Sequence, residues 1–330
     1  MDTPTHTSHS SRAVTSHPAP SQGSMPGRSA KGIVIGGFTL AVLAALLVFG
    51  LPYLQHKVNP IGKPFLFAAG PLPGSALYVA DPGTGTSTPL TVMVNGKSLH
   101  ALDAQRALNG TWYFILNEGG VSNLYKMTSD GNIMRLTQSA TAKYNLSFDQ
   151  SSGRLAYQAI VPPVDGNPSF LLRQDWNVTI FDPKDSKEIV AATGTDPFLV
   201  PGGNQLLLRR GNSLVLQTVG QKATATVLTL PSGVYAIDPN VETVTVYNPV
   251  TKNLDQYALT HGFSPNYTSS IVLKDAPSAL GYVNGQLVAT FVARTKTESN
   301  FVFMPVGAAA ESIFVPAITN GAPQRLYSYE

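Results

Sequence analysis

The sequence predicts an all-β protein, a β-propeller of about six blades that is preceded by a single transmembrane α-helix. Three observations predict it: strand openings recur every 38 to 51 residues, turn residues stand just before most of them, and one long apolar run lies near the start. Four short strands per roughly 45 residues is the period of a propeller blade. A pair of β-sandwich sheets is the alternative that the same strands allow.

Six strand openings share an apolar and β-branched composition. They are residues 65–67, 112–114, 155–157, 206–208, 244–246 and 287–289. Most follow residues that tolerate a positive φ, namely Asn109-Gly110, Ser152-Gly153, Gly202-Gly203 and Asn284-Gly285. We therefore expect a strand, a tight turn and the next strand at each of these places.

The propeller is predicted to cover residues 65–330, with its first blade lacking an innermost strand. Phe65 follows almost directly on the linker from the apolar run, which leaves no room for one. Residues 324–329 can supply the missing strand and close the ring. Closure of this kind removes sheet edges that would otherwise invite aggregation. The blade count is uncertain by one, because the 51-residue spacing allows an insertion around 161–173.

Three strands end in Asp-Pro or Asn-Pro, at Asp81, Asp182 and Asn248. An Asx side chain at the first turn position bonds its own backbone, and the proline presets φ for a type I turn. These residues are therefore predicted to form turns rather than to bind a ligand.

Residues 1–31 are predicted to be a disordered cytoplasmic tail. Residues 1–30 contain seven Ser, four Thr and four Pro without apolar periodicity. Such a stretch cannot bury enough surface to offset its ordering entropy.

Residues 32–54 are predicted to form the transmembrane helix, and residues 55–64 a linker. Gly32 to Leu51 is a run of 20 residues without a charge, the length that spans a bilayer as a helix. A cleaved signal peptide is the competing interpretation, but no small-x-small site follows the run. Gly32 and Gly36 form a GxxxG step, which makes them candidates for a helix–helix dimer contact.

The charges around this run predict a plasma (inner) membrane protein with its C-terminal domain outside the cytoplasm. Arg12, Arg28 and Lys31 precede the run, while Lys57 and Lys63 follow it. Positively charged residues favour the cytoplasmic side.

The composition excludes several classes of protein. There is no cysteine, which excludes disulfides, thiolate zinc sites and a cysteine nucleophile. Only 12% of residues are charged, 22 Lys and Arg against 19 Asp and Glu. Because the body carries no basic stripe, we expect no nucleic-acid binding.

One stretch resembles a known family. Residues 124–137 and 146–157 contain a tyrosine strand, an Asp-Gly turn, Arg-Leu-Thr and a further turn into the next strand. This order is similar to the WD40-like repeat of TolB-type propellers, although Asp149-Gln150 replaces the family's Pro-Asp pair. The Asp-Pro strands resemble surface-layer propellers of the YVTN type. The motif residues are structural in these families, so the resemblance implies a fold and not an activity.

No catalytic, metal or cofactor constellation is visible. The body holds two histidines, His100 and His261, which are expected to be half-exposed turn residues. Ser213 lacks the glycine that a nucleophile elbow needs two residues later. Acidic residues near predicted loops leave a paired-carboxylate site open without singling out a pair; these are Asp165, Asp175, Asp238 and Asp275.

Arg209 and Arg210 are the best candidates for a polar contact in the channel. They are adjacent on a predicted strand, so their side chains point to opposite faces. One of them should therefore meet a neighbouring sheet or the channel, where its charge needs a partner. Four Asn-x-Ser/Thr sequons add a conditional hypothesis of glycosylation, at Asn109, Asn145, Asn177 and Asn266.

These observations together predict a non-enzymatic, protein-binding or scaffolding module of the cell envelope. Its expected partners are an envelope protein, bound through blade-connecting loops, and the lipid bilayer through residues 32–54. An envelope enzyme acting on glycans and a sensor domain for a small ligand are the alternatives.

Overall fold

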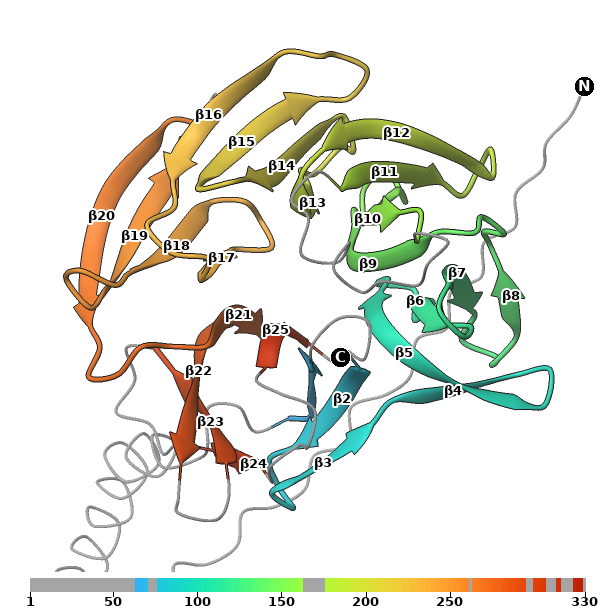
Figure 1. Ribbon diagram of the computed structural model, residues 1–330, viewed down its shortest axis with the longest axis horizontal. Helices are drawn as coiled ribbons and strands as arrows, with labels where there is room; N and C mark the ends of the chain where they lie inside the picture. Colours follow the sequence, from blue (N-terminus) through green and yellow to red (C-terminus); the bar gives the residue numbers. More distant parts are fainter. Residues whose placement is uncertain are drawn as a thin grey trace, which may run out of the picture. The chain divides into compact units, whose positions relative to one another are not determined.

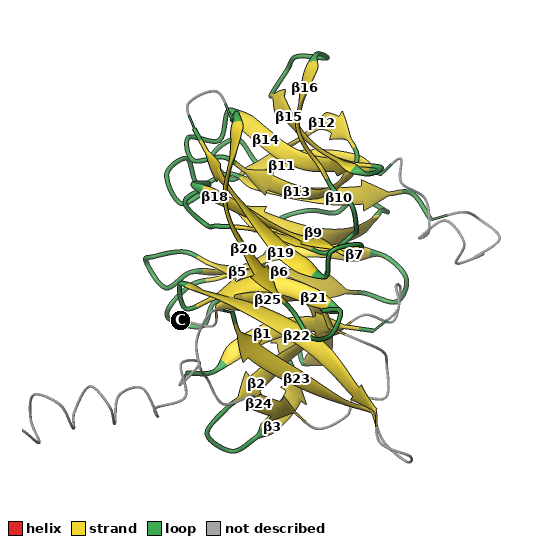
Figure 2. Cartoon of the chain, turned by 90° about the vertical axis from the view of Figure 1, so that its left-hand side faces the viewer, coloured by secondary structure: helices red, strands yellow, loops and turns green. Residues whose placement is uncertain are grey.

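Six β-sheets stand around a common axis (Figure 1). The computed structural model of the chain describes residues 63–70, 76–162, 176–260, 263–294, 299–306, 313–315 and 323–328. Viewed from the side, this part of the chain consists of strands and loops (Figure 2). No helix within these ranges is long and apolar enough to cross a membrane. The predicted tail and the predicted span at 32–54 lie outside them.

Each sheet is one blade, and its strands are named from the innermost to the outermost. Blade 1 holds β25 (Pro323–Ser328), β1 (Phe65–Ala69), β2 (Ala76–Asp81) and β3 (Thr86–Pro89). Blade 2 holds β5 (Lys97–Arg106), β6 (Trp112–Asn117), β7 (Ser122–Met127) and β8 (Ile133–Arg135). Blade 3 holds β9 (Ala142–Phe148), β10 (Leu155–Ile160), β11 (Asn177–Asp182) and β12 (Lys187–Thr193).

The other three blades follow the same order. Blade 4 holds β13 (Thr195–Leu199), β14 (Gln205–Arg210), β15 (Ser213–Thr218) and β16 (Thr224–Thr229). Blade 5 holds β17 (Tyr235–Ile237), β18 (Thr243–Asn248), β19 (Asn253–Leu259) and β20 (Pro265–Val272). Blade 6 holds β21 (Ala279–Val283), β22 (Gln286–Arg294), β23 (Ser299–Pro305) and β24 (Ile313–Val315). The six-bladed propeller is thereby confirmed.

The six predicted strand openings are the second strands of the six blades, β1, β6, β10, β14, β18 and β22. The turns before them use left-handed backbone, with φ of 82° at Gly110, 76° at Gly153 and 49° at Asn284. A residue with a bulky or β-branched side chain is strained there, which is why glycine and asparagine mark the openings.

The predicted closure of the ring is also confirmed. β25 pairs antiparallel with β1, with Leu66 opposite Tyr327 and Phe67 opposite Leu326. Blade 1 therefore takes its innermost strand from a segment far along the sequence. The edge of β1 that faces the axis is covered by this pairing.

The hydrophobic core is divided into six clusters, and each cluster fills the seam between two neighbouring blades. The seam between blades 6 and 1 shows the packing. Phe303 of β23 meets Phe65 and Phe67 of β1 at ring-centroid distances of 5.0 and 5.2 Å. The side chains of both sheet faces thus bury their apolar surface against a neighbour.

One blade has an extra strand, and the Asx turns do not all end the same strand of their blades. Blade 2 carries a fifth strand, β4 (Thr91–Val94), which pairs with the first half of β5. The Asx turns form as predicted: Asp81 Oδ1 accepts the amide of Gly83, and Asp182 Oδ1 accepts that of Lys184. Asn248 ends the second strand of its blade, whereas the two aspartates end the third strands of theirs.

Candidate functional site

The innermost strands of all six blades enclose a cavity of about 550 Å³ on the axis. Every blade contributes to its wall, through residues of β5, β9, β13, β17, β21 and β25. The cavity also reaches the turns that join innermost to second strands in blades 3 to 5, at Asp149–Ser151, Pro201 and Pro239–Asn240. These turn residues form its mouth. A volume of this size lies within the range of binding pockets for small molecules and inserted side chains.

Apolar and aromatic side chains share the wall with polar ones. Phe148, Phe198, Tyr235 and Tyr282 come from four different blades. Burial raises the pKa of Tyr282, so its hydroxyl stays protonated and able to donate a hydrogen bond. Large rings with a polar tip are suited to holding a partner that is apolar in one part and polar in another.

Three charged residues line the cavity, Arg106, Asp149 and Asp196. The guanidinium carbon of Arg106 lies 5.6 Å from the ring centroid of Trp112, within the range of a cation–π contact. Asp149 accepts hydrogen bonds from the hydroxyls of Ser151 and Ser152. Burial alone would raise the pKa of Asp149, but these hydrogen bonds outweigh burial and hold it below its usual value.

Side-chain hydrogen bonds between blades fix the wall in place. Asp103 Oδ2 in blade 2 accepts the amide of Leu146 in blade 3 at 2.7 Å. Ser147 Oγ in blade 3 accepts the amide of Leu199 in blade 4 at 2.9 Å. Gly202 in blade 4 donates its amide to Asp149 Oδ2 at 3.0 Å. The mouth is therefore organised before any partner arrives, which lowers the cost of binding.

Two innermost strands carry a polar residue in left-handed backbone, Asn145 at φ 58° and Asp196 at φ 51°. Asn145 Nδ2 donates to Asp196 Oδ1 at 2.8 Å and to Gln158 Oε1 at 2.7 Å. Asp196 donates its amide to the same oxygen of Gln158 at 3.1 Å. These bonds hold the left-handed backbone of the two neighbouring strands in place. Asparagine and aspartate tolerate this backbone better than most residues.

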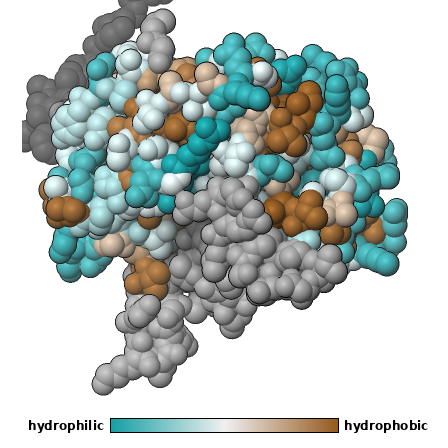
Figure 3. Space-filling view, turned by 45° about the horizontal axis from the view of Figure 1, so that its top comes forward, coloured by the Kyte–Doolittle hydropathy of each residue, from teal (hydrophilic) through white to brown (hydrophobic). Residues whose placement is uncertain are grey.

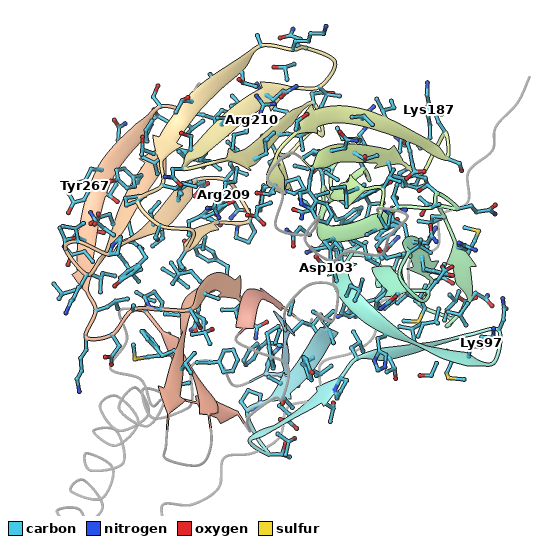
Figure 4. All side chains as sticks on the ribbon, in the orientation of Figure 1. Lys97, Asp103, Lys187, Arg209, Arg210 and Tyr267 are labelled. Carbon is cyan, nitrogen blue, oxygen red and sulfur yellow. The ribbon has the colours of Figure 1, made fainter. Side chains whose placement is uncertain are left out.

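The two arginines singled out by the sequence point to opposite sides of blade 4, as adjacent strand residues do (Figure 4). Arg210 donates to Thr193 O, toward blade 3, and to Gln217 Oε1. Arg209 donates to Gly211 O, and its guanidinium lies against Gly233. Neither arginine is among the described residues that line the cavity, although Gly233 is. The channel contact therefore stays a prediction.

The remaining candidates have structural or exposed positions. His100 lies in strand β5 and is exposed, so its predicted place in a turn was wrong. Asp238 accepts the amide of Asn240 in a turn, and Asp275 is exposed. Four predicted candidates lie outside the described residues, namely Gly32, Gly36, Asp165 and Asp175, as does His261.

The sequons differ in their surroundings. Asn109, Asn177 and Asn266 are exposed. Asn145 is half-buried and uses its amide nitrogen in the two hydrogen bonds described above. A glycan at Asn145 would replace one of the two N–H groups, so both hydrogen bonds could not be kept.

On the face shown in Figure 3, hydrophobic residues form separate patches among hydrophilic ones. Within the described ranges, no group of three or more His, Asp or Glu side chains is placed to hold a metal ion.

No family model matches the chain, and no curated protein matches its sequence. Solved structures match it in fold. TolB from Acinetobacter baumannii aligns with a TM-score of 0.50 and 10% sequence identity, over 86% of this chain and 72% of that one. The fold is a TolB-like β-propeller. A chain of a nidogen/laminin complex aligns with a TM-score of 0.48 and 9% identity, over 81% of this chain and 98% of that one.

In this TolB-like propeller, the stretch that resembles the family repeat covers β7, β8, β9 and β10. Asp149, where the family has a proline, anchors the turn between β9 and β10 and the contact with Gly202. Sequence reasoning missed the aromatic lining of the cavity. The one sequence signal for this lining is that Phe148 and Phe198 stand shortly before predicted turns. Many core residues have the same position, so the signal does not single out the cavity.

Proposed function

We propose that the chain is a membrane-anchored propeller on the outer side of the plasma membrane, where it binds an envelope protein as a non-catalytic scaffold. The observation that carries this proposal is the axial cavity, which residues of all six blades line, four of them contributing an aromatic ring, and whose mouth is made of short turns. Protein-binding hot spots have this composition, with aromatic anchors in a preformed hollow. The anchor and the location rest on the uncharged run at 32–51 and on the charges around it.

The two carboxylates of the cavity support a non-catalytic role. Asp149 accepts hydrogen bonds from two serines and from Gly202, and Asp196 accepts one from Asn145. A glycosidase needs one carboxyl group free to protonate the leaving oxygen and a second free to attack or to activate water. Both groups here hold turns and strands together instead.

A small-ligand sensor is the second candidate, because the cavity volume is also that of a small-molecule pocket. A ligand that fills the cavity would stabilise the fold by an amount that grows with the logarithm of its concentration above the dissociation constant. A protein partner and a small ligand therefore predict different results in the experiment that follows.

The test is crosslinking of the full-length protein in its native membrane, followed by mass spectrometry of the proteins that co-purify. Asn240→Trp places a large ring at the mouth, where Asn240 is exposed. Val250→Trp is the matched control, an exposed turn residue of the same blade that does not line the cavity. We expect one stoichiometric envelope partner, lost in Asn240→Trp and retained in Val250→Trp.

Equal recovery of the partner by both variants would reject the cavity mouth as the binding face. Recovery of no protein above background would reject the scaffold proposal and favour the sensor. In that case, screening small ligands for thermal stabilisation of the wild type, with Asn240→Trp as the control, decides whether the cavity binds one.

A further inference from the structure

Lys143 of β9 is a lysine with no exposed surface, held entirely by neutral oxygen atoms. Its Nζ donates to Ser139 Oγ and to Thr141 Oγ1, each at 2.8 Å. It also donates to Ser122 O at 2.9 Å and, more weakly, to Asn123 Oδ1 at 3.4 Å. Among the described residues, no carboxylate lies close enough to Lys143 to form an ion pair. A buried ammonium in such surroundings loses its proton more easily than one in water.

The charged groups that face Lys143 come from three other parts of blades 2 and 3. Burial is the largest effect and lowers the pKa of Lys143 to about 8. Glu188 of β12 and Glu118 after β6 oppose this shift, while Arg135 of β8 adds to it. A sizeable fraction of the amine is therefore neutral slightly above neutral pH, with a lone pair able to accept a proton.

Ser139 is the group placed to give up that proton. It is half-buried in the connection between β8 and β9, four residues before the lysine. Its Oγ lies 2.8 Å from Lys143 Nζ and 3.4 Å from Glu188 Oε1, so the amine is the nearer acceptor. A serine bonded to a neutral buried lysine is an activated nucleophile, as in hydrolases that use a Ser–Lys pair.

Thr141 positions the amine. Its Oγ1 bonds Lys143 Nζ and lies 3.2 Å from Ser139 Oγ. The carbonyl of Ser122 holds a second N–H direction of the same nitrogen. These two contacts hold the nitrogen within 2.8 Å of the serine hydroxyl, while its contact with Asn123 Oδ1 is longer, at 3.4 Å.

We propose that Ser139 is an acyl-acceptor site, which takes an acyl group from an activated ester with Lys143 as its base. The proton of Ser139 Oγ moves to Lys143 Nζ while Oγ bonds to the acyl carbon. The bond from that carbon to the leaving oxygen breaks, and the proton passes from Nζ to the leaving alkoxide. The product is an ester on Ser139 and a free alcohol. This is a covalent attachment that needs no turnover, and it goes beyond the scaffold function because none of the three residues lines the cavity.

The test uses an alkyl fluorophosphonate on the full-length protein, because this probe reacts with activated serines. Oγ bonds to phosphorus, the phosphorus–fluorine bond breaks, and the serine proton leaves with fluoride. Peptide mapping is expected to place the label on Ser139. Ser232 is an internal control, since it is half-buried as well but donates to Tyr247 O instead of meeting an amine.

Four variants test the part that each residue plays in the labelling reaction. Ser139→Ala is expected to abolish the label, and Lys143→Met to slow labelling on the order of 100-fold, the usual contribution of a general base. Thr141→Val is expected to slow labelling about tenfold by removing one hydrogen bond, and Thr141→Ser to restore it. The labelling rate of the wild type should rise with pH through about 8.

Three results would overturn the proposal. They are no label on Ser139, equal labelling of Ser232, and a rate in Lys143→Met that matches the wild type. Thermal unfolding shows whether each variant folds. If Lys143→Met does not fold, the pH profile of the wild type decides, and a rate that stays flat across pH 7 to 9 rejects the lysine as the base.

Discussion

The seam between blades 2 and 3 and the seam between blades 4 and 5 join similar sheets in different ways. The seam between blades 2 and 3 packs an apolar cluster that includes Tyr113, Leu155 and Trp176, and it also buries two polar side chains that contact each other across the blades, Asn123 and Lys143. The seam between blades 4 and 5 is filled by leucine and valine, such as Leu207, Leu214 and Val244. An apolar seam gains its stability from burial alone. A polar seam must pair every group that it buries, and in return it holds side chains in one fixed geometry.

The largest expected effect comes from a deletion in the apolar seam. Leu214→Ala should lower the free energy of unfolding by about 3 kcal/mol, because Leu214 is fully buried and its neighbours cannot close the cavity. Val250→Ala, at a position 89% exposed, is the control and should change it by less than about 0.5 kcal/mol. Urea unfolding followed by circular dichroism measures both. Equal changes in the free energy of unfolding for Leu214→Ala and Val250→Ala would contradict a contribution of this seam to stability.

The second prediction concerns the buried lysine of the polar seam. Its pKa falls from 10.5 to about 8 in the folded protein, so the unfolded chain binds more protons between these values. Lys143 therefore destabilises the fold fully below pH 8, and the penalty fades as the pH rises toward 10.5. Lys143→Met should raise stability at pH 7 by up to about 3 kcal/mol, at about 1.4 kcal/mol for each pKa unit.

The advantage of Lys143→Met over the wild type should shrink between pH 7 and pH 10. Unfolding curves at several pH values measure the difference between the two proteins, which cancels the titration of other groups. A difference that does not change with pH would mean that the lysine stays charged throughout.

The third prediction removes a partner from the polar seam. Asn123 is fully buried, accepts from Thr137 Oγ1 at 3.0 Å and donates to Glu118 Oε1 at 3.3 Å. Asn123→Ala removes both hydrogen bonds and should cost about 2 kcal/mol, although Thr137 Oγ1 still accepts the amide of Leu124 and Glu118 Oε1 still accepts the hydroxyl of Tyr125. Lys143 Nζ also donates to Asn123 Oδ1, at 3.4 Å. The same change in the Lys143→Met background should therefore cost less, because this third hydrogen bond is already absent. A double-mutant cycle measures this coupling, and additive effects would argue against a single network.

The smallest expected effect lies at the edge of the polar seam. Arg135 Nη2 and Glu118 Oε2 form an ion pair at 2.9 Å, with the arginine side chain 39% exposed. Arg135→Ala should lower stability by less than about 1 kcal/mol, and high salt should reduce the difference. Thermal unfolding at low and high salt checks it. A large effect that salt does not reduce would place this pair inside the buried network.

The local features of the fold could be predicted from the sequence, because each depends on a few adjacent residues. The turns at Gly110, Gly153 and Asn284 need a positive φ, and the Asx turns at Asp81 and Asp182 need a side-chain acceptor. Closure by the last strand followed from counting strands per blade. The period and the turns together predicted about six blades, with an uncertainty of one, and the structure has six.

The candidate sites could not be predicted, because they depend on contacts between blades. Asn145 meets Asp196 and Gln158 only after β9, β10 and β13 have come together. Ser139 and Lys143 are close in sequence, but only burial between two blades changes the chemistry of the amine. Arg209 and Arg210 were correctly placed on opposite faces, yet the sequence did not show which neighbouring blade each would meet.

The pairing of β25 with β1 has a consequence for synthesis in the cell. A ribosome makes β1 early and β25 only after all the other strands of the six blades. Until then, the backbone of β1 that will face the axis has no strand to bond, and blade 1 remains a three-stranded sheet with an open edge. Chains halted before β25 should therefore be recognised by chaperones and proteases as unfinished, even when five blades have already formed.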